Sequence, residues 1–190
     1  LSAAGYLVGL IGRRENLLKE ILAQNPERFR YAVADVMEPD QTVRTLEKLR
    51  ETLGGLDLCI VSAGAGELNP SLDFETEKPV IRTNVVGWTA VVDWAYAGFE
   101  RQGEGHLVVI TSVGGLRGSA AAPAYNASKA YQINYAEALR QKAAKSKSSV
   151  CVTDIRPGLV ATAMAKGDGL FWVMPVEKAV SQIVHAIHKH

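Results

Sequence analysis

The sequence contains little cysteine, no long hydrophobic run and no excess of charge of either sign. Its only cysteines, Cys59 and Cys151, each lie inside a short apolar segment. This pattern predicts two buried core thiols in a reducing, cytoplasmic compartment and argues against a disulfide scaffold. No apolar stretch reaches the roughly 18 residues that cross a bilayer, so we do not expect a membrane protein.

Charge is nearly balanced, with 21 basic and 20 acidic residues and no long run of either kind. Proteins that bind nucleic acid or a membrane surface normally carry a basic patch, so we expect neither partner here. The four histidines do not have the spacing of a metal-ligand set, and we expect no metal. A small molecule is the expected partner.

Short apolar runs alternate with longer amphipathic segments along the chain. This order is typical of an α/β fold in which crossover helices cover a parallel sheet. The 190 residues suit one domain, 1–190, with a doubly wound, Rossmann-like sheet in three αβα layers. The expected strands are 6–11, 29–35, 56–64, 105–112 and 150–158. The expected helices lie near 13–24, 39–53, 76–101, 122–146 and 175–189.

Polar and small residues follow each expected strand. In doubly wound sheets, ligands bind beyond the carboxyl ends of the strands, so these residues are expected to share one edge. In chain order they are Arg13 and Arg14, Asp35, Ser62 to Gly64, Ser112, and Pro157 with Gly158.

Tyr125 and Lys129 are four residues apart in "YNASK" and would share one face of a helix. An ammonium beside a phenol stabilises the phenolate and makes tyrosine a usable acid or base. The hydroxyl of Ser112 could donate a hydrogen bond to the same substrate oxygen. Taken alone, a tyrosine and a lysine at this spacing are more often a surface pair.

Several motifs in one order carry a stronger signal. They are "SAGAG" from Ser62, "TNVVG" with Asn84, "ITS" with Ser112, "YNASK", and "RPGLVAT" from Arg156 to Thr162. In this combination the chain resembles the short-chain dehydrogenase/reductase family over nearly all of its length. The resemblance implies an oxidoreductase that moves hydride between a nicotinamide cofactor and a carbonyl or alcohol substrate.

The resemblance also implies roles for particular residues. Tyr125 would exchange a proton with the substrate oxygen, Ser112 would hold that oxygen, and Lys129 would support Tyr125 and bind the nicotinamide ribose. Asn84 would support a water that links Lys129 to solvent. Besides Tyr125 and Lys129, the residues implied in cofactor binding are Arg13, Arg14, Asp35, Val36, Ser62, Ala63, Gly64, Pro157, Gly158, Val160 and Thr162.

The choice between NADP and NAD can be argued from charge. NAD-binding folds place a carboxylate after the second strand of the fold, whereas the 2'-phosphate of NADP needs cations. Here Gly12 stands at the expected carboxylate position, and Arg13 and Arg14 follow it. This favours NADP, with NAD as the alternative, and Arg13 is the stronger candidate because a guanidinium can hold phosphate through two bonds. Surface arginines at the start of a helix are the other interpretation.

One family feature is missing from the sequence. Short-chain dehydrogenases begin with a strand and a Thr-Gly-x-x-x-Gly-x-Gly turn that approaches the cofactor pyrophosphate. Neither occurs before "YLVGLIGRR". Without that strand two buried strand edges would lack partners. We therefore expect the sequence to be incomplete at both ends, a hypothesis that an intact mass near 20.5 kDa would refute. A non-catalytic dinucleotide sensor or scaffold is the alternative function.

Two further expectations concern the substrate and assembly. An apolar pocket wall is expected at the residues Leu116, Leu159, Met164, Phe171, Trp172 and Met174, although the last three could equally pack under a loop, and 165–172 could form a lid. The resemblance implies a homodimer or homotetramer paired through two long helices. The aromatic residues of those helices could instead pack against the sheet; they are Trp88, Trp94, Tyr131 and Tyr135.

Overall fold

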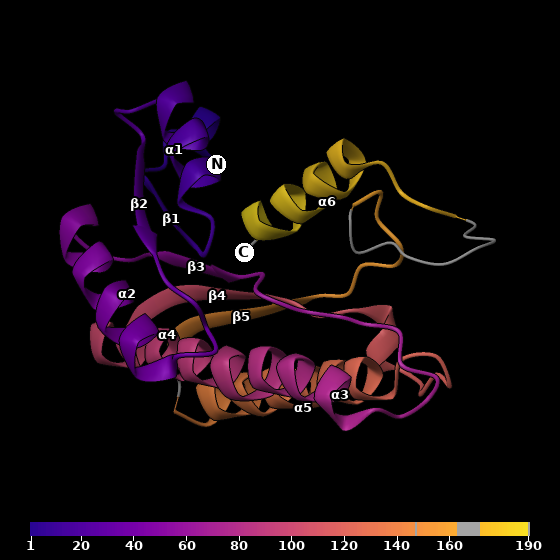
Figure 1. The fold of residues 1–190 in the computed structure, drawn as a ribbon. Coiled ribbons are helices and arrows are strands. Elements are labelled where there is room, and N and C mark those ends of the chain that lie inside the picture. The colour runs from indigo at the N-terminus through magenta and orange to yellow at the C-terminus, as the bar shows by residue number, and fades with distance from the viewer. Residues whose placement is uncertain (147, 163–171, 190) are drawn as a thin grey trace.

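The computed structural model describes residues 1–146, 148–162 and 172–189. It confirms the expected α/β class, with parallel strands between two layers of helices (Figure 1). The first pair of strands is β1 (Val8–Gly12) with β2 (Phe29–Val33). The second set, in the order β3-β4-β5, consists of β3 (Leu58–Val61), β4 (Glu104–Ile110) and β5 (Ser149–Ile155).

The strands of the described residues form two sheets that are not joined by hydrogen bonds. Among the described residues, main-chain groups along one edge of β1 and one edge of β3 are therefore not used in strand pairing. A cavity of about 1020 Å³ lies between these edges, and most residues of both strands contribute to its wall. One additional parallel strand would complete a continuous sheet at this place.

The cavity corrects one expectation about the cysteines. Cys59 and Cys151 are free, but both are only partly buried rather than core residues. Cys59 lies on β3 and lines the cavity, and Cys151 lies on β5, an edge strand of the described sheet. Burial among neighbouring atoms still raises the pKa of the Cys59 thiol to about 12, so this thiol is a poor nucleophile.

Helices cover both sides of the strands. In Figure 1, α6 (Val176–His188) lies above the β3-β4-β5 sheet, whereas α4 (Trp88–Gln102) and α5 (Pro123–Ser146) lie below it. The β1-β2 pair packs against α1 (Glu15–Gln24) and α2 (Pro39–Leu53). Helix α2 has the expected boundaries: Pro39 is in its first turn, and Gly54 closes it in the left-handed conformation at φ 79°.

The helix expected near 76–101 is divided into three parts. These are α3 (Phe74–Ile81), a π-helical turn η2 (Arg82–Gly87) and α4. Wide turns of this kind occur frequently at functional sites, and this one contains Asn84. Short 3₁₀ turns, η1 (Ser2–Ala4) and η3 (Val113–Gly115), complete the described elements.

The main hydrophobic core lies between the β3-β4-β5 sheet and the two long helices. Leu107, Val108 and Val109 on the central strand β4 are completely buried. Trp88 is also completely buried and makes edge-to-face contacts with the rings of Tyr131 and Tyr135. Trp88 belongs to this core, and Tyr131 and Tyr135 pack against it, so these three side chains take part in internal packing.

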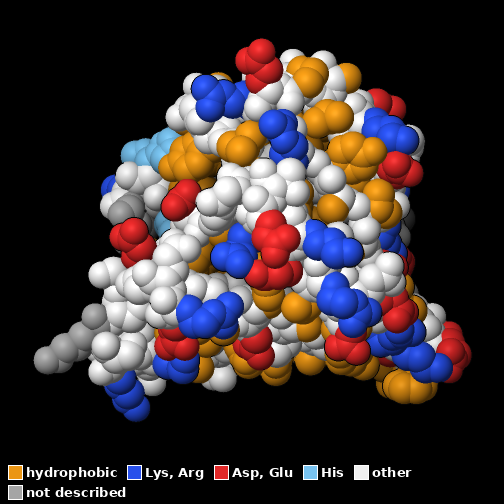
Figure 2. Space-filling view, turned by 90° about the vertical axis from the view of Figure 1, so that its left-hand side faces the viewer, with side chains coloured by type: hydrophobic (Ala, Val, Ile, Leu, Met, Phe, Trp, Pro, Cys, Tyr) orange, Lys and Arg blue, Asp and Glu red, His pale blue; other side chains and the backbone are white. Residues whose placement is uncertain are grey.

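On the face of the molecule seen in Figure 2, acidic and basic side chains are interspersed and neither sign of charge dominates. The two ends of the described chain lie near each other (Figure 1). The ring of Tyr6 stacks on that of His188, with 6.4 Å between the ring centres. Among the described helices, none combines the length and apolar character needed to cross a membrane.

Candidate active site

Ser112, Tyr125 and Lys129 come together at the carboxyl end of β4. Ser112 directly precedes η3, while Tyr125 and Lys129 lie on α5. A Cβ built on Gly114 would lie 3.2 Å from Ser112 Oγ and 3.3 Å from Tyr125 Cε1, so this glycine lies between the two side chains. Lys129 Nζ is 6.0 Å from the centre of the Tyr125 ring. The structure therefore brings together the three side chains that the sequence analysis named as candidates for catalysis.

Close backbone approach fixes the ring of Tyr125. A Cβ built on Gly66 would lie only 2.9 Å from Tyr125 Cδ2, a distance that side chains do not tolerate. Glycine at this position therefore lets the loop after β3 cover one side of the ring, while Gly114 approaches another ring atom. The phenol is half-buried between these loops.

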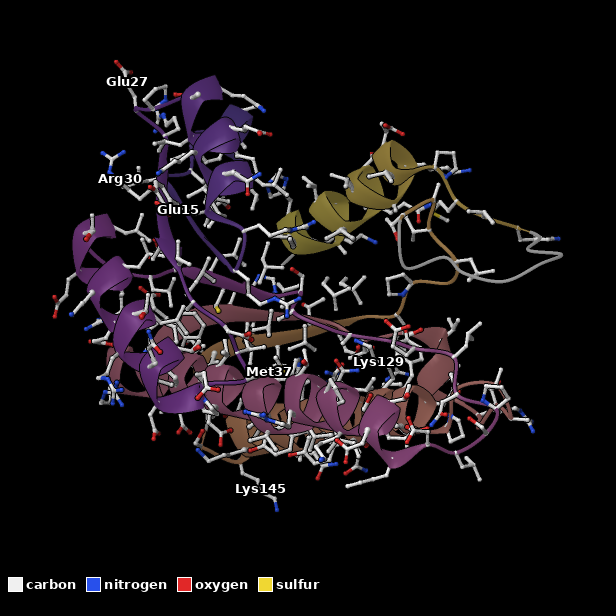
Figure 3. The ribbon with its side chains drawn as sticks, viewed as in Figure 1. Glu15, Glu27, Arg30, Met37, Lys129 and Lys145 are labelled. Carbon is white, nitrogen blue, oxygen red and sulfur yellow. The ribbon has the colours of Figure 1, made fainter. Side chains whose placement is uncertain are left out.

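Lys129 is a buried cation with defined partners. Its side chain lies between α5 and the sheet (Figure 3), and the residue is only 4% exposed. Its Nζ donates hydrogen bonds to the carbonyl of Ile110 at 3.1 Å and to Oε1 of Gln132 at 2.9 Å. Burial lowers the pKa of Lys129 to about 8, and the negative charge of Asp154 partly opposes this effect.

Asn84 is completely buried in the π-helical turn η2. Its side chain accepts a hydrogen bond from the main-chain nitrogen of Ala65 and donates to the carbonyl of the same residue, at 2.8 and 2.7 Å. It also donates to Ser128 Oγ on α5 at 2.9 Å. Asn84 thus ties the loop after β3 to α5, and its own carbonyl accepts a hydrogen bond from Gln132.

Sequence reasoning missed two groups next to this site. Gln132 is completely buried and contacts both Lys129 and Asn84. Its position three residues after Lys129, on the same helix face, is a signal that the sequence did contain. The Asp154 carboxylate on β5 is 2% exposed and accepts hydrogen bonds from Thr111 Oγ1 and Arg156 Nε, at 2.5 and 2.6 Å. Only the three-dimensional structure brings this network close to Lys129.

Several of the expected cofactor residues line the large cavity. They are Arg13, Asp35, Val36, Ser62, Ala63 and Gly64. Arg13 Nη1 lies 3.8 Å from Asp35 Oδ2, and the Arg13 side chain is 68% exposed, so its guanidinium remains accessible. Arg14 is exposed at the N-cap of α1 and is not among the residues lining this cavity.

Gly64 connects the cavity to the catalytic candidates. A Cβ built on Gly64 would lie 3.6 Å from both Asn84 Oδ1 and Lys129 Nζ. Within the described parts of the chain, the wall of this cavity does not include Ser112, Tyr125 or Lys129. The structure therefore shows two adjoining regions, one with Arg13 and Asp35 and one with the hydroxyl groups and the lysine.

The loop after β5 lies beside the candidate active site, next to Ser112. The Pro157 carbonyl accepts a hydrogen bond from Val113 N at 3.0 Å, which holds this loop beside Ser112. Val160 pairs with Met174, and Gly158 and Thr162 are exposed. Leu116, Leu159 and Trp172 are 59%, 40% and 91% exposed. Met164 and Phe171, and the expected lid up to residue 171, lie outside the described residues.

The described residues contain no group of three or more histidine, cysteine, aspartate or glutamate side chains that could hold a metal ion.

Comparisons with known proteins agree with this architecture. An uncharacterized oxidoreductase of Mycobacterium tuberculosis is 32% identical over 197 residues, which cover 99% of this chain and 77% of the relative. One of Myxococcus xanthus is 36% identical over 128 residues, covering 66% of this chain and 50% of the relative. The crystal structure of serine dehydrogenase from Escherichia coli has a TM-score of 0.82 at 24% identity, covering 96% of this chain and 80% of that one, and this likeness concerns the fold.

The model of the family described as short chain dehydrogenase matches residues 1–169, a range that includes Asn84, Ser112, Tyr125 and Lys129. The match extends over most of the sequence. The chain belongs to the short-chain dehydrogenase/reductase family of oxidoreductases.

Proposed function

We propose that this protein is an NADP-dependent oxidoreductase that interconverts a carbonyl and an alcohol, with Tyr125 as general acid and base. The observation that carries the proposal is the meeting of Ser112, Tyr125 and Lys129 at the end of β4. Three groups that could bind and protonate one substrate oxygen lie together, although they come from two separate segments. In a tyrosine–lysine pair on an open helix surface, the lysine would be exposed and no strand-end serine would lie beside the tyrosine, whereas here Lys129 is buried and Ser112 is near Tyr125.

Tyr125 and Ser112 would act on the same substrate oxygen. The Ser112 Oγ accepts a hydrogen bond from Gly114 N at 3.0 Å, so its own proton is available for the substrate. During reduction the phenol of Tyr125 would give its proton to the carbonyl oxygen, and during oxidation the phenolate would take the proton of the alcohol. General acid–base catalysis of this kind contributes typically about 10²- to 10⁴-fold to a rate.

Lys129 would stabilise the phenolate by its charge. Two of its three N–H bonds are directed to Ile110 and Gln132, which fixes the ammonium and leaves one donor for a cofactor hydroxyl. With a pKa of about 8, Lys129 is mainly protonated at pH 7. The lysine thus supplies positive charge without sharing it with a carboxylate in direct contact.

The residues around the large cavity fit the adenosine end of a dinucleotide. The Arg13 guanidinium is accessible beside the cavity and suits the 2'-phosphate of NADP, while Asp35, Val36 and Ser62 to Gly64 line the wall where the adenine half would lie. When bound, the nicotinamide supplies or accepts the hydride. A solved structure with a similar fold is titled the closed form of serine dehydrogenase complexed with NADP⁺.

The pyrophosphate lacks its usual partner within this sequence. We propose that full cofactor affinity requires one further parallel strand and a glycine-rich turn in the gap between β1 and β3. The unpaired strand edges and the cavity of about 1020 Å³ support this proposal. A chain extended by strand, turn and helix should bind NADPH at least tenfold more tightly than the 190-residue chain, and equal affinity would contradict it.

The same gap favours a second candidate function, a dinucleotide sensor or scaffold that does not turn over substrate. Calorimetry with NADPH and NADH, followed by NADPH oxidation with a panel of ketones and aldehydes, separates the two. An enzyme binds NADPH more tightly than NADH and oxidises it with at least one carbonyl. Tight NADPH binding without turnover, and without any effect of Tyr125→Phe, supports the sensor and contradicts the enzyme.

We also propose that the protein forms a homodimer or homotetramer, as members of this family often do. The outward sides of α4 and α5 are the surfaces that we expect to pair, because their inward aromatic residues already pack on each other. Light scattering of the purified protein tests this, and a monomer at micromolar concentration would contradict it.

A further inference from the structure

Gln132 is a completely buried polar residue that connects two parts of the candidate site. Its Nε2 donates a hydrogen bond to the carbonyl of Asn84 at 2.9 Å, and its Oε1 accepts one from Lys129 Nζ at 2.9 Å. Burial of an amide is unfavourable unless its polar atoms are hydrogen-bonded. Here both ends of the amide are used, and both partners belong to the candidate site.

The orientation of this amide is determined by chemistry. A lysine ammonium can only donate, so it must face the amide oxygen, and a carbonyl can only accept, so it must face the amide nitrogen. The Asn84 carbonyl therefore fixes which end of Gln132 points to Lys129. Asn84 is itself held by Ala65 and Ser128, so the hydrogen bonds form one continuous chain from the loop after β3 to Lys129.

We propose that Gln132 is a positioning residue that holds the charged side chain of Lys129 against Tyr125, with the carbonyl of Asn84 as its anchor. In this arrangement the link between Asn84 and Lys129 is a side-chain amide. An amide keeps its protons and does not pass them along, so Gln132 fixes a charge rather than conducting protons. The catalytic part of this inference rests on the proposed function, whereas the effect on Lys129 does not.

The surroundings of Lys129 make this contact important. Among the described residues, the charged and titratable groups that face its ammonium are Tyr125 on α5 and Asp154 on β5, and neither forms an ion pair with it within 4.0 Å. The other direct partner is the neutral carbonyl of Ile110. The amide oxygen of Gln132 is thus one of two contacts that compensate for the desolvation of the ammonium.

Replacement of Gln132 by methionine tests the proposal, because methionine has a similar length and cannot accept a strong hydrogen bond. In protein labelled with ¹³C-lysine, the Cε signal of Lys129 is titrated and is assigned by its loss in Lys129→Met. We expect Gln132→Met to lower the pKa of Lys129 by about one unit, because the charged form loses an acceptor. Gln141→Met, an exposed position on the same helix, should leave the pKa of Lys129 unchanged.

Gln132→Glu is the complementary variant. It keeps an acceptor oxygen toward Lys129, so we expect a pKa for Lys129 at or above that of the wild type. If the methionine variant does not fold, the pKa of Lys129 in Gln132→Glu still tests the proposal. A fall in the pKa of Lys129 similar to that in Gln132→Met would overturn the proposal.

The pH profile of alcohol oxidation distinguishes positioning from simple structural support. In Gln132→Met we expect the active pH range to become narrower by about one unit on each side. Phenolate is stabilised less on the acid side, and Lys129 loses its proton earlier on the alkaline side. A lower melting temperature with an unchanged pKa of Lys129 and an unchanged profile would refute the proposal. If the wild type oxidises no substrate, the proposed function fails, yet the NMR titration still decides the role of Gln132.

Discussion

The Nζ atom of Lys129 lies 6.0 Å from the centre of the Tyr125 ring, one helical turn away on the same side of α5. Lys129 is nevertheless held mainly by atoms outside that helical turn, the Ile110 carbonyl on β4 and the Gln132 amide. The position of the charge thus depends on a tertiary contact with β4 and on a local contact within α5, while the spacing of the pair is set by the sequence. This combination leads to several experiments.

Removal of the buried charge should change how stability depends on pH. The pKa of Lys129 is about 8 in the folded protein and 10.5 in its unperturbed state, so the unfolded chain binds more protons between these values. Stability of the wild type relative to Lys129→Met should therefore rise by about 3 kcal/mol from pH 8 to 10.5. Denaturant unfolding of both proteins at each pH gives this difference in the free energy of unfolding. Lys145→Met, exposed in the last turn of α5, should give a flat difference, and a flat difference for Lys129→Met would contradict the assignment.

Cofactor preference should depend on Arg13. Its side chain is 68% exposed beside the cavity, and its guanidinium lies 3.8 Å from the carboxylate of Asp35. Arg13→Ala should weaken NADPH binding by about ten- to a hundredfold, because a charge-assisted phosphate contact contributes about 1.5–3 kcal/mol. NADH binding should change less than threefold by calorimetry. Arg44→Ala, an exposed arginine on α2, serves as the control; equal losses for both cofactors would argue against a 2'-phosphate contact.

A side chain at position 66 should disturb the phenol. In Gly66→Ala the new Cβ would lie 2.9 Å from Tyr125 Cδ2, so the ring or the loop must move. We expect kcat to fall about tenfold or more, because a small displacement of a catalytic group lowers the rate of the chemical step strongly. Gly118→Ala introduces a Cβ with no atom within 4 Å and should retain the activity of the wild type. Steady-state kinetics with the same carbonyl compares them, and full activity of Gly66→Ala would show that the ring position is not critical.

The buried aromatic cluster should contribute to stability rather than to assembly. Trp88 is completely buried against Tyr131 and Tyr135, and Trp88→Ala should cost about 3–5 kcal/mol in the free energy of unfolding. Trp172→Ala, at a residue that is 91% exposed, should change it by less than about 0.5 kcal/mol. Urea unfolding followed by circular dichroism gives both values. A shift in oligomeric state without loss of stability would assign these aromatics to an interface.

Local patterns predicted much of this molecule. Apolar runs indicated the strands, the amphipathic pattern indicated a helix near 39–53, and the four-residue spacing placed Tyr125 and Lys129 together. The π-helical turn at Asn84 was not predictable, because the apolar pattern continues through it and its hydrogen bonds reach Ala65 and Ser128. Contacts between such distant segments depend on packing, which local periodicity does not encode.

The same reason explains the groups that the sequence did not reveal. Gln132 contacts the Asn84 carbonyl across 48 positions of the chain, and Thr111 reaches Asp154 across 43. The sequence did predict two strand edges without partners. It did not predict that these edges would border a cavity lined by Arg13, Asp35 and Cys59, because the size of a cavity depends on how the flanking helices pack.

The most direct measurement of the central claim is the turnover of NADPH by Tyr125→Phe, together with its affinity for NADPH. The variant lacks only the hydroxyl group, so the account predicts an unchanged dissociation constant and a kcat lower by at least about 10²-fold. A Tyr125→Phe variant that binds NADPH normally and reduces the carbonyl at the rate of the wild type would contradict proton transfer by Tyr125.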